Sequence, residues 1–158
     1  MGADERGASR VALVTGAKCG IVFEVCRRLV RGDMRVVLGA RDPEQAESAT
    51  KKLSGEDLEA LYHAVDVSED ESVGRLAACL EEEIGKLDVL VNNAATYVDR
   101  SETVLTTDLS TAHKVLNPNL FGAWRACQTF LPLIHRSAHD RIVNVSSGAG
   151  SPGDPQFG

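Results

Sequence analysis

Residues 11–22 read VALVTGAKCGIV, a short apolar run, a glycine-bearing turn and the start of an amphipathic segment. An apolar run of this length fits a strand that is buried on both faces of a parallel sheet. A glycine turn between such a strand and a helix brings backbone N–H groups to the helix N-terminus, where they can hold a pyrophosphate. Taken alone, the turn is equally consistent with a plain connection between two elements.

Short apolar runs alternate with longer amphipathic segments along the rest of the chain. Such alternation is typical of repeated βαβ units around a parallel sheet. Predicted strands cover residues 11–14, 35–38, about 58–65, 87–91 and 141–145, and predicted helices lie near residues 20–31, 43–53, 69–85 and 108–136.

Three local signals bear on where these helices begin and break. Asp42 followed by Pro43 indicates an N-cap and a first helical position. Residues 68–71, SEDE, are typical of a capping box with acidic side chains at the positive end of a helix. Pro118 lies inside the longest predicted helix, and we expect it to kink or split that helix because proline lacks an N–H donor.

Five parallel strands with right-handed crossovers predict an α/β fold, a Rossmann-type doubly wound sheet of strand order 3-2-1-4-5. Such sheets bind ligands at the carboxyl ends of their strands, and the switch point here lies between strands 1 and 4. We expect residues 1–9 to be a flexible N-terminus and residues 10–158 to be one dinucleotide-binding domain, incomplete on its C-terminal side. The strand at 141–145 would then be an exposed apolar edge, which predicts poor solubility.

Composition narrows the functional classes. The chain has 158 residues, 43% hydrophobic and 25% charged, as expected for one soluble domain. Its net charge of -6 and the lack of any Lys/Arg run argue against nucleic-acid and membrane partners. An export signal and an 18-residue apolar stretch are both absent from the sequence, and the scattered cysteines show no CxxC spacing. We therefore expect a cytoplasmic protein with no metal site and no disulfide framework.

Three further segments carry a family resemblance. Residues 87–95 read LDVLVNNAA, residues 119–122 read NLFG, and a serine pair follows the last predicted strand. Together with the glycine turn, and in this order, they resemble the short-chain dehydrogenase/reductase family over residues 10–158, with the carbonyl reductase branch nearest. The resemblance implies an oxidoreductase that transfers hydride between NAD(P) and a carbonyl group.

The resemblance also implies a set of cofactor-binding residues. Arg41, preceded by Ala40 where NAD-preferring members carry an acid, favours NADP(H) over NAD(H), because a guanidinium can bind a 2′-phosphate. The alternatives are a solvated surface role for Arg41 and an N-cap role for Asp66. The full set implied is Gly16, Lys18, Gly20, Ile21, Arg41, Asp66, Val67, Asn93 and Ala94.

This chain departs from the family pattern at three places in the cofactor-binding segments. Val22 replaces the third glycine of the turn, Cys19 replaces a common second basic residue, and Ala95 replaces the glycine that ends the LDVLVNNAA segment. The Val22 side chain would lie where the family packs backbone against the cofactor or a strand.

Two of the family's four catalytic positions match this chain. By resemblance, Asn119 holds a water of the proton relay and Ser147 steadies the carbonyl oxygen; a plain polar strand-end role is the alternative for Ser147. The family's Tyr-xxx-Lys pair would fall past Gly158, and neither Tyr62 nor Tyr97 matches it. We therefore expect these 158 residues to be inactive, or nearly so, by themselves.

Three functional hypotheses remain at this point. The chain is the N-terminal part of an NADPH-dependent reductase whose substrate is a small aldehyde, ketone or quinone. Alternatively, it is a cofactor-binding or partner-binding module without catalysis, which forms a homo-oligomer or pairs with a full-length homologue by strand addition. The third hypothesis is a degenerate, non-functional product.

Overall fold

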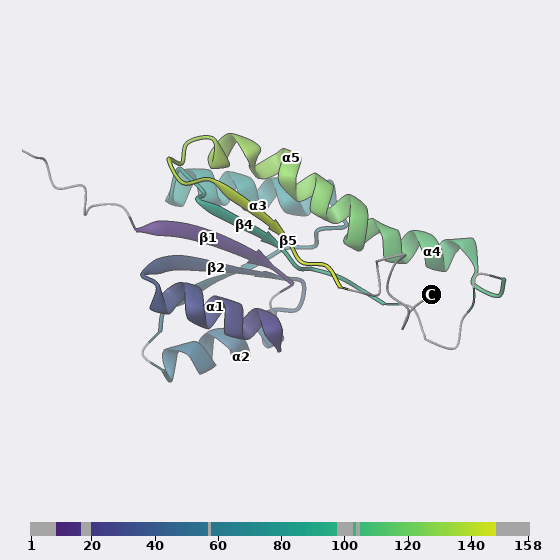
Figure 1. Cartoon of the computed structure of the whole chain (residues 1–158), viewed down its shortest axis with the longest axis horizontal. Coiled ribbons are helices and arrows are strands. Elements are labelled where there is room, and N and C mark those ends of the chain that lie inside the picture. Colours follow the sequence, from purple (N-terminus) through teal and green to yellow (C-terminus); the bar gives the residue numbers. More distant parts are fainter. Residues whose placement is uncertain (1–8, 17–19, 57, 98–102, 104, 148–158) are drawn as a thin grey trace, which may run out of the picture.

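A five-stranded parallel sheet forms the centre of the molecule, with the order β3-β2-β1-β4-β5 (Figure 1). This order confirms the prediction from the sequence. The computed structural model describes residues 9–16, 20–56, 58–97, 103 and 105–147. The strands are β1 Arg10–Thr15, β2 Met34–Ala40, β3 Ala60–Ala64, β4 Val89–Asn92 and β5 Arg141–Asn144.

Helices cover both faces of the sheet, as a doubly wound Rossmann-type fold requires. Helices α1 (Ile21–Arg31) and α2 (Pro43–Ser54) lie on one side, and α3 (Asp70–Glu83) and α5 (Ala123–Ile134) lie on the other (Figure 1). Helix α4 (Leu109–Leu116) and the π-helical segment η1 (Asn117–Gly122) precede α5 and extend beyond the sheet.

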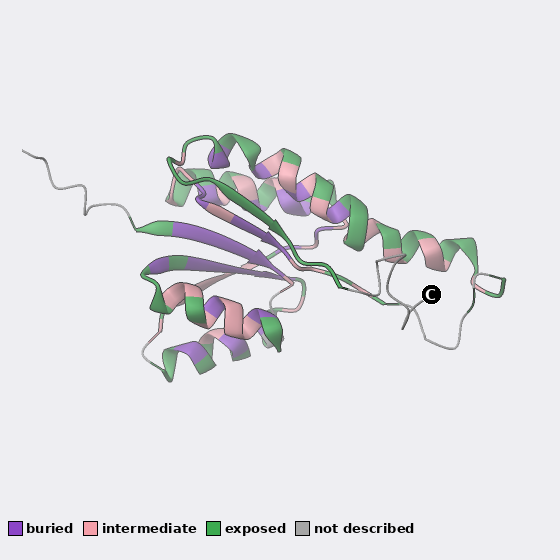
Figure 2. Cartoon of the chain, viewed as in Figure 1, coloured by how far each residue is buried: buried purple, intermediate pink, exposed green. Residues whose placement is uncertain are grey.

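The two faces of β1 enter two separate apolar clusters. Val11 and Leu13 pack with residues of α3 and α5, whereas Ala12 and Val14 pack with residues of α1 and α2. Because successive side chains on a strand point to opposite faces, a strand covered on both faces must be apolar throughout. Figure 2 shows buried residues along the central strands and on the inward faces of the helices.

The predicted long helix at 108–136 is interrupted at Pro118, as expected. The chain forms α4, then the wider turns of η1, and then α5. Proline cannot donate the i→i−4 hydrogen bond, and a π-helical turn is one way in which a helix accommodates this loss. Gly122 ends η1 against Val67, where an added Cβ would lie 2.8 Å from Val67 Cγ2. The interruption therefore brings the helix backbone close to the segment after β3.

One of the two predicted helix starts is confirmed and the other is wrong. Asp42 Oδ1 accepts a hydrogen bond from Glu44 N (3.0 Å) at the start of α2. At α3, however, the N-cap is Glu69, and no side chain caps the helix. The predicted capping box fails because Asp66 Oδ1 accepts from Ser68 N (2.8 Å), which forms a tight turn before the helix. The Asp66 amide in turn donates to Ser72 Oγ (2.9 Å).

Strand β5 is an exposed edge among the described residues. It pairs with β4 along one side, and Ile142, Val143 and the following Val145 are 41%, 45% and 48% exposed. An apolar edge strand with open backbone groups is a surface on which another strand can pair. Within the described part of the chain, none of the helices combines the length and apolar character needed to cross a membrane.

Asp88 joins three parts of the fold at the start of β4. Its carboxylate is 2% exposed and accepts hydrogen bonds from Val11 N (2.7 Å) and Ser137 Oγ (2.5 Å). Lys86 Nζ lies 3.0 Å from Oδ2. Burial raises the pKa of Asp88, but these hydrogen bonds outweigh burial and hold the pKa below its ordinary value.

We predict that Asp88→Asn lowers the free energy of unfolding at pH 7 by about 1–3 kcal/mol, because a charged acceptor is lost at a buried site. A carboxylate whose pKa is lowered by folding stabilises the fold above its unfolded pKa of about 4 and loses this effect as the pH falls through its folded pKa. The difference in unfolding free energy between wild type and Asp88→Asn should therefore shrink below about pH 4. Urea unfolding at several pH values from about 7 to about 3 measures this difference.

The control for this experiment is Asp140→Asn, which changes an exposed aspartate in the loop before β5. Its unfolding free energy should follow that of wild type at every pH. A constant offset between wild type and Asp88→Asn down to pH 3 would show that the charge of Asp88 is not the source of its effect.

Candidate functional site

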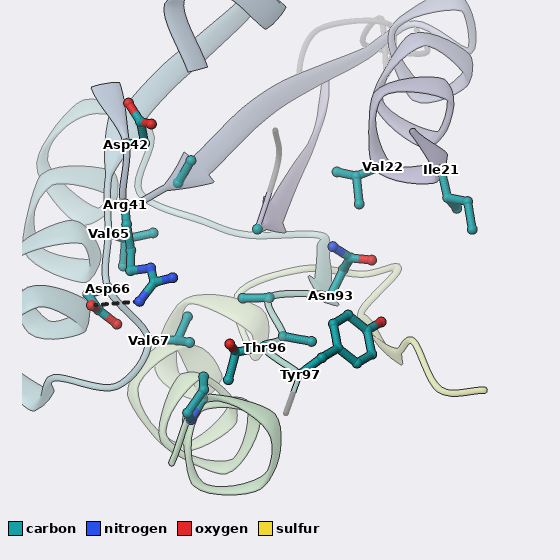
Figure 3. Close-up of a pocket in the computed structure, with 15 residues that line it drawn as sticks. Ile21, Val22, Arg41, Asp42, Val65, Asp66, Val67, Asn93, Thr96 and Tyr97 are labelled. Atoms are coloured by element: carbon teal, nitrogen blue, oxygen red, sulfur yellow. Dashed lines mark ion pairs between the residues drawn. The ribbon is translucent and has the colours of Figure 1, made fainter. Parts of the chain in front are cut away.

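A cleft of about 660 Å³ lies at the carboxyl ends of the strands, where the prediction placed the binding site. This volume is in the range of small-molecule and cofactor sites, about 300–1,000 Å³. Figure 3 shows side chains from the segments after β2, β3 and β4 and from the start of α1 around it. Its lining comprises Gly16, Ile21, Val22, Ala40, Arg41, Asp42, Val65, Asp66, Val67, Asn93, Ala94, Ala95, Thr96, Tyr97 and Pro118.

At the base of the cleft, the backbones after β1 and β4 come into direct contact. Gly16 has a φ of +74°, and a Cβ added to it would lie 2.5 Å from Ala94 Cα and 2.8 Å from Ala94 N. No L-residue with a side chain fits this position without displacing the Ala94 backbone, and the positive φ disfavours one independently. Gly16 N donates to Gly39 O (2.7 Å), which fixes the turn against β2 as well.

Thr15 is a site residue that the sequence reasoning missed. Its side-chain hydroxyl accepts from Asn93 N (3.1 Å) and Ala94 N (3.2 Å) and donates to Val91 O (3.2 Å). This uses the one donor and both acceptor positions of the hydroxyl. Asn93 Nδ2 donates to Thr15 O (3.3 Å), so Asn93 both lines the cleft and helps to hold the ends of β1 and β4 together. A hydroxyl residue at the end of an otherwise apolar strand was the available signal.

The start of α1 forms one end of the cleft. Gly20 is the N-cap, with φ 70° and ψ −132°, and no side chain caps the first turn. The start of a helix presents the positive end of the helix dipole to an anion. Ile21 is largely exposed at the cleft, whereas Gly20 itself is not among its lining residues. Lys18 and Cys19, which the sequence analysis also considered, lie outside the described residues.

Val22, which replaces a family glycine, is 5% exposed. It packs in the same apolar cluster as Val14 and Cys26 and also lines the cleft. Its side chain therefore contributes both to the core beneath α1 and to the lining of the cleft. Ala95 lines the cleft too.

Arg41 and Asp66 lie at the opposite end of the cleft from α1 (Figure 3). Arg41 Nη1 is 3.8 Å from Asp66 Oδ2, and the Arg41 side chain is 65% exposed. Asp66 is not the N-cap of α3, which is Glu69. Its neighbour Val67 lines the cleft, and the Val67 carbonyl accepts from Arg125 Nη1 (2.6 Å). The segment after β3 therefore has an arginine beside each of these two residues, Arg41 near Asp66 and Arg125 at Val67.

The two residues with implied catalytic roles do not line the cleft. Asn119 Oδ1 accepts from Thr96 N (2.8 Å), and Asn119 Nδ2 donates to Thr96 O (2.9 Å). Its side chain therefore fastens the segment after β4 to η1, and Thr96 is the residue that reaches the cleft. Ser147 follows β5 and is exposed. Asn119 therefore reaches the cleft only through Thr96, and no contact between Ser147 and a cleft residue is seen among the described residues.

Two tyrosines also differ in their placement. Tyr97 is 88% exposed and lines the cleft, which the sequence did not predict. Tyr62 lies on β3, where its hydroxyl donates to Ala40 O (3.5 Å). Burial, with a smaller effect of Asp42, raises the pKa of Tyr62 above its ordinary value.

The sequence model of the short chain dehydrogenase family matches residues 10–158. This chain belongs to the short-chain dehydrogenase family. The (+)-neomenthol dehydrogenase of Arabidopsis thaliana is 36% identical to it over 161 residues, covering 89% of this chain and 54% of the relative. Carbonyl reductase (NADPH) 1 of Bos taurus is 41% identical over 140 residues, covering 87% of this chain and 48% of the relative.

Solved structures of short-chain dehydrogenases share the fold. A metagenomic short-chain oxidoreductase in complex with NADP superimposes with a TM-score of 0.82 at 30% identity, covering 89% of this chain and 63% of that one. Salutaridine reductase from Papaver somniferum gives a TM-score of 0.80 at 31% identity, covering 90% and 58%. The chain spans about half the length of the curated relatives it matches.

We predict that Thr15→Val lowers the free energy of unfolding by about 1–3 kcal/mol, because two N–H groups lose their shared acceptor while the side-chain shape is kept. Thr15→Ser keeps the hydroxyl and should lie much closer to wild type. Urea unfolding of both variants measures the difference. A loss in Thr15→Ser with Thr15→Val close to wild type would mean that the methyl group, and not the hydroxyl, holds the two strand ends together.

We further predict that Gly16→Ala destabilises this domain more than Gly20→Ala does. Both glycines have φ near +70°, which costs a side chain about 1–3 kcal/mol. Only at Gly16 does the added Cβ meet backbone atoms, whereas at Gly20 it meets nothing within 4 Å. Overlap in a packed region costs about a further 1–3 kcal/mol. Thermal unfolding checks the order, and equal losses would contradict the close contact.

Proposed function

We propose that the cleft binds NADP(H) and that this chain is the cofactor-binding part of a carbonyl-reducing short-chain dehydrogenase. The proposal rests mainly on the bare backbone at Gly16, which lies too close to Ala94 for any side chain. The uncapped start of α1 adjoins it. Bare backbone beside a helix N-terminus is complementary to a pyrophosphate.

The far end of the cleft supports NADP(H) over NAD(H). Arg41 offers a planar pair of donors suited to a 2′-phosphate. Its distance of 3.8 Å from Asp66 is longer than a charge-assisted hydrogen bond, so the guanidinium is not committed to that carboxylate. Ala40 adds no acid that would repel a phosphate. Among the relatives, carbonyl reductase (NADPH) 1 is named for the same cofactor.

The remaining residues at the cleft have one of two roles in this proposal: they contact the adenosine of the cofactor, or they hold the strand ends in place. Asp66 and Val67 would contact the adenine ring, and Ala94 would leave room for the ribose. Thr15 and Asn93 hold the strand ends that carry these groups, through hydrogen bonds of 3.1–3.3 Å. The cofactor, when bound, supplies a hydride for reduction of an aldehyde, ketone or quinone.

The catalytic part of the proposal rests on the family resemblance. Asn119 would hold a water and Ser147 would steady the carbonyl oxygen of the substrate. In the 158 residues, neither Tyr62 nor Tyr97 is followed four positions later by Lys. General acid catalysis is typically worth about 10²–10⁴-fold. We therefore expect this polypeptide alone to bind the cofactor with little or no turnover.

Arg41→Ala tests the cofactor assignment. We expect the Kd for NADPH to rise about 10- to 100-fold and the Kd for NADH to stay nearly constant, because only NADPH carries the phosphate that Arg41 would bind. Isothermal titration calorimetry or the fluorescence of the bound nicotinamide measures both constants.

Arg75→Ala is the matched control. Arg75 is 70% exposed and lies 3.8 Å from the Glu71 carboxylate, so it resembles Arg41 in exposure and pairing but does not line the cleft. Its removal should change neither constant. Loss of NADPH and NADH affinity together in Arg41→Ala would contradict the phosphate contact, and wild-type affinity for both would place the cofactor elsewhere.

A further inference from the structure

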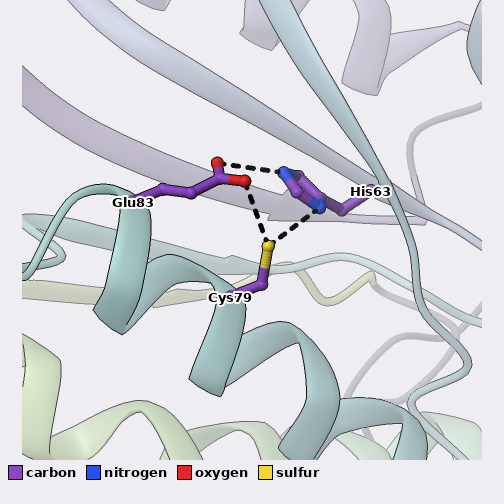
Figure 4. A group of neighbouring side chains, drawn as sticks. All are labelled: His63, Cys79 and Glu83. Carbon is purple, nitrogen blue, oxygen red and sulfur yellow. Dashed lines mark hydrogen bonds and ion pairs between the residues drawn. The ribbon is translucent and has the colours of Figure 1, made fainter.

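A second cluster of chemically active side chains lies outside the cofactor cleft, between β3 and α3 (Figure 4). His63 is on β3, and Cys79 and Glu83 are one turn apart on α3. Residues at i and i+4 share one face of a helix. Leu61 packs into the apolar cluster of α3 and α5, and His63, two residues later, faces the same side of the sheet.

The three side chains already point toward one another (Figure 4). Cys79 Sγ lies 3.3 Å from Glu83 Oε1 and 3.8 Å from His63 Nδ1, and His63 Nε2 lies 3.8 Å from Glu83 Oε2. One ligand atom from each residue lies within 4.8 Å of the others. Ligands around a tetrahedral zinc ion are separated by about 3.3–3.8 Å, given bonds of about 2.0–2.3 Å. The two His63 distances involve different ring nitrogens, and only one nitrogen can bind a given ion. A common set of ligand atoms therefore lies within 4.8 Å, and the side chains would close by a small movement to surround a zinc ion.

The chemistry of the three donors is specific. Thiolate, imidazole and carboxylate are the groups that bind Zn²⁺ in proteins, whereas a thiolate disfavours Mg²⁺ and Ca²⁺. This is a mixed set of donors and not a patch of surface acids. The His63 side chain is 22% exposed and that of Glu83 is 45% exposed, which leaves an open side for a water as the fourth ligand.

The surrounding charge also favours a cation. Glu81 pairs with Arg136 at 2.6 Å, whereas the partners that the structure gives Glu83 are His63 and Cys79. Neither Lys nor Arg is paired with Glu83 among the described residues. A divalent cation placed between the three side chains would be attracted to the Glu83 carboxylate, whose charge is not balanced by a Lys or Arg among the described residues.

We propose that His63, Cys79 and Glu83 form a site for a thiophilic divalent cation, with Zn²⁺ as the preferred ion. The bound ion joins the edge strand β3 to α3 and takes a water as its fourth ligand. None of the three residues lines the cofactor cleft, so this site does not depend on the proposed function.

Titration of the metal-free 158-residue protein with Co²⁺, followed by displacement with Zn²⁺, tests the site. We expect one equivalent of Co²⁺ to give a thiolate-to-cobalt charge-transfer band that Zn²⁺ removes. Cys79→Ser should abolish the band. Glu83→Gln should weaken Zn²⁺ binding by more than the roughly 10–100-fold typical of losing an outer-shell partner. Zn²⁺ should also raise the Tm of wild type by several degrees and leave that of Cys79→Ser unchanged, since it binds the folded state.

Cys127→Ser is the matched control, because Cys127 is also a partly exposed free thiol but lies outside the cluster. It should retain the band, the stoichiometry and the rise in Tm. The proposal is overturned if Co²⁺ gives no thiolate band, or if the band follows Cys127 instead of Cys79. It is also overturned if Glu83→Gln binds Zn²⁺ as tightly as wild type. A failure here would leave NADPH binding unaffected, so the two proposals are tested separately.

Discussion

The contact between the backbones of Gly16 and Ala94 is the constraint on which the site depends. The 2.5 Å between an added Cβ at Gly16 and Ala94 Cα requires glycine after β1 and allows β1 and β4 to end together. Thr15 then binds both strand ends through its hydroxyl. Because the strand order reverses at this pair, the helices diverge to opposite faces and the cleft opens between them. A small change here alters the core and the site together.

Much of the fold was predictable because it follows from local patterns and from topology rules. Apolar runs such as residues 11–14 must be buried on both faces, and right-handed crossovers leave few strand orders to consider. The cleft followed from the same argument, since the carboxyl ends of β1 and β4 had to meet. Arg41, Asp66 and Asn93, which the family resemblance implied, do line this cleft. Pro118 was predictable for a purely local reason, its missing donor.

What sequence reasoning missed are contacts between segments far apart in the chain. Asp88 binds Val11 N, 77 positions away, and no local pattern distinguishes this role from that of a surface aspartate. Ser68 looked like a helix cap, but Asp66 competes for the same backbone and moves the cap to Glu69. Asn119 matched a family motif, but its hydrogen bonds to both the N–H and the carbonyl of Thr96 could not be read from the sequence. Side-chain partners in each case depend on the assembled fold.

The cluster of His63, Cys79 and Glu83 is another contact between segments far apart in the chain. It connects β3 to α3. Cysteine spacing predicted no metal site, because the ligands come from a strand and a helix separated by 16 positions. The chain between His63 and Cys79 contains Asp66 and Val67, which line the cleft. At its N-terminal end this segment is held by β3, and Arg125 fixes the Val67 carbonyl. A cation at the cluster would close the segment into a loop, and closing a loop reduces the conformational freedom of the residues inside it.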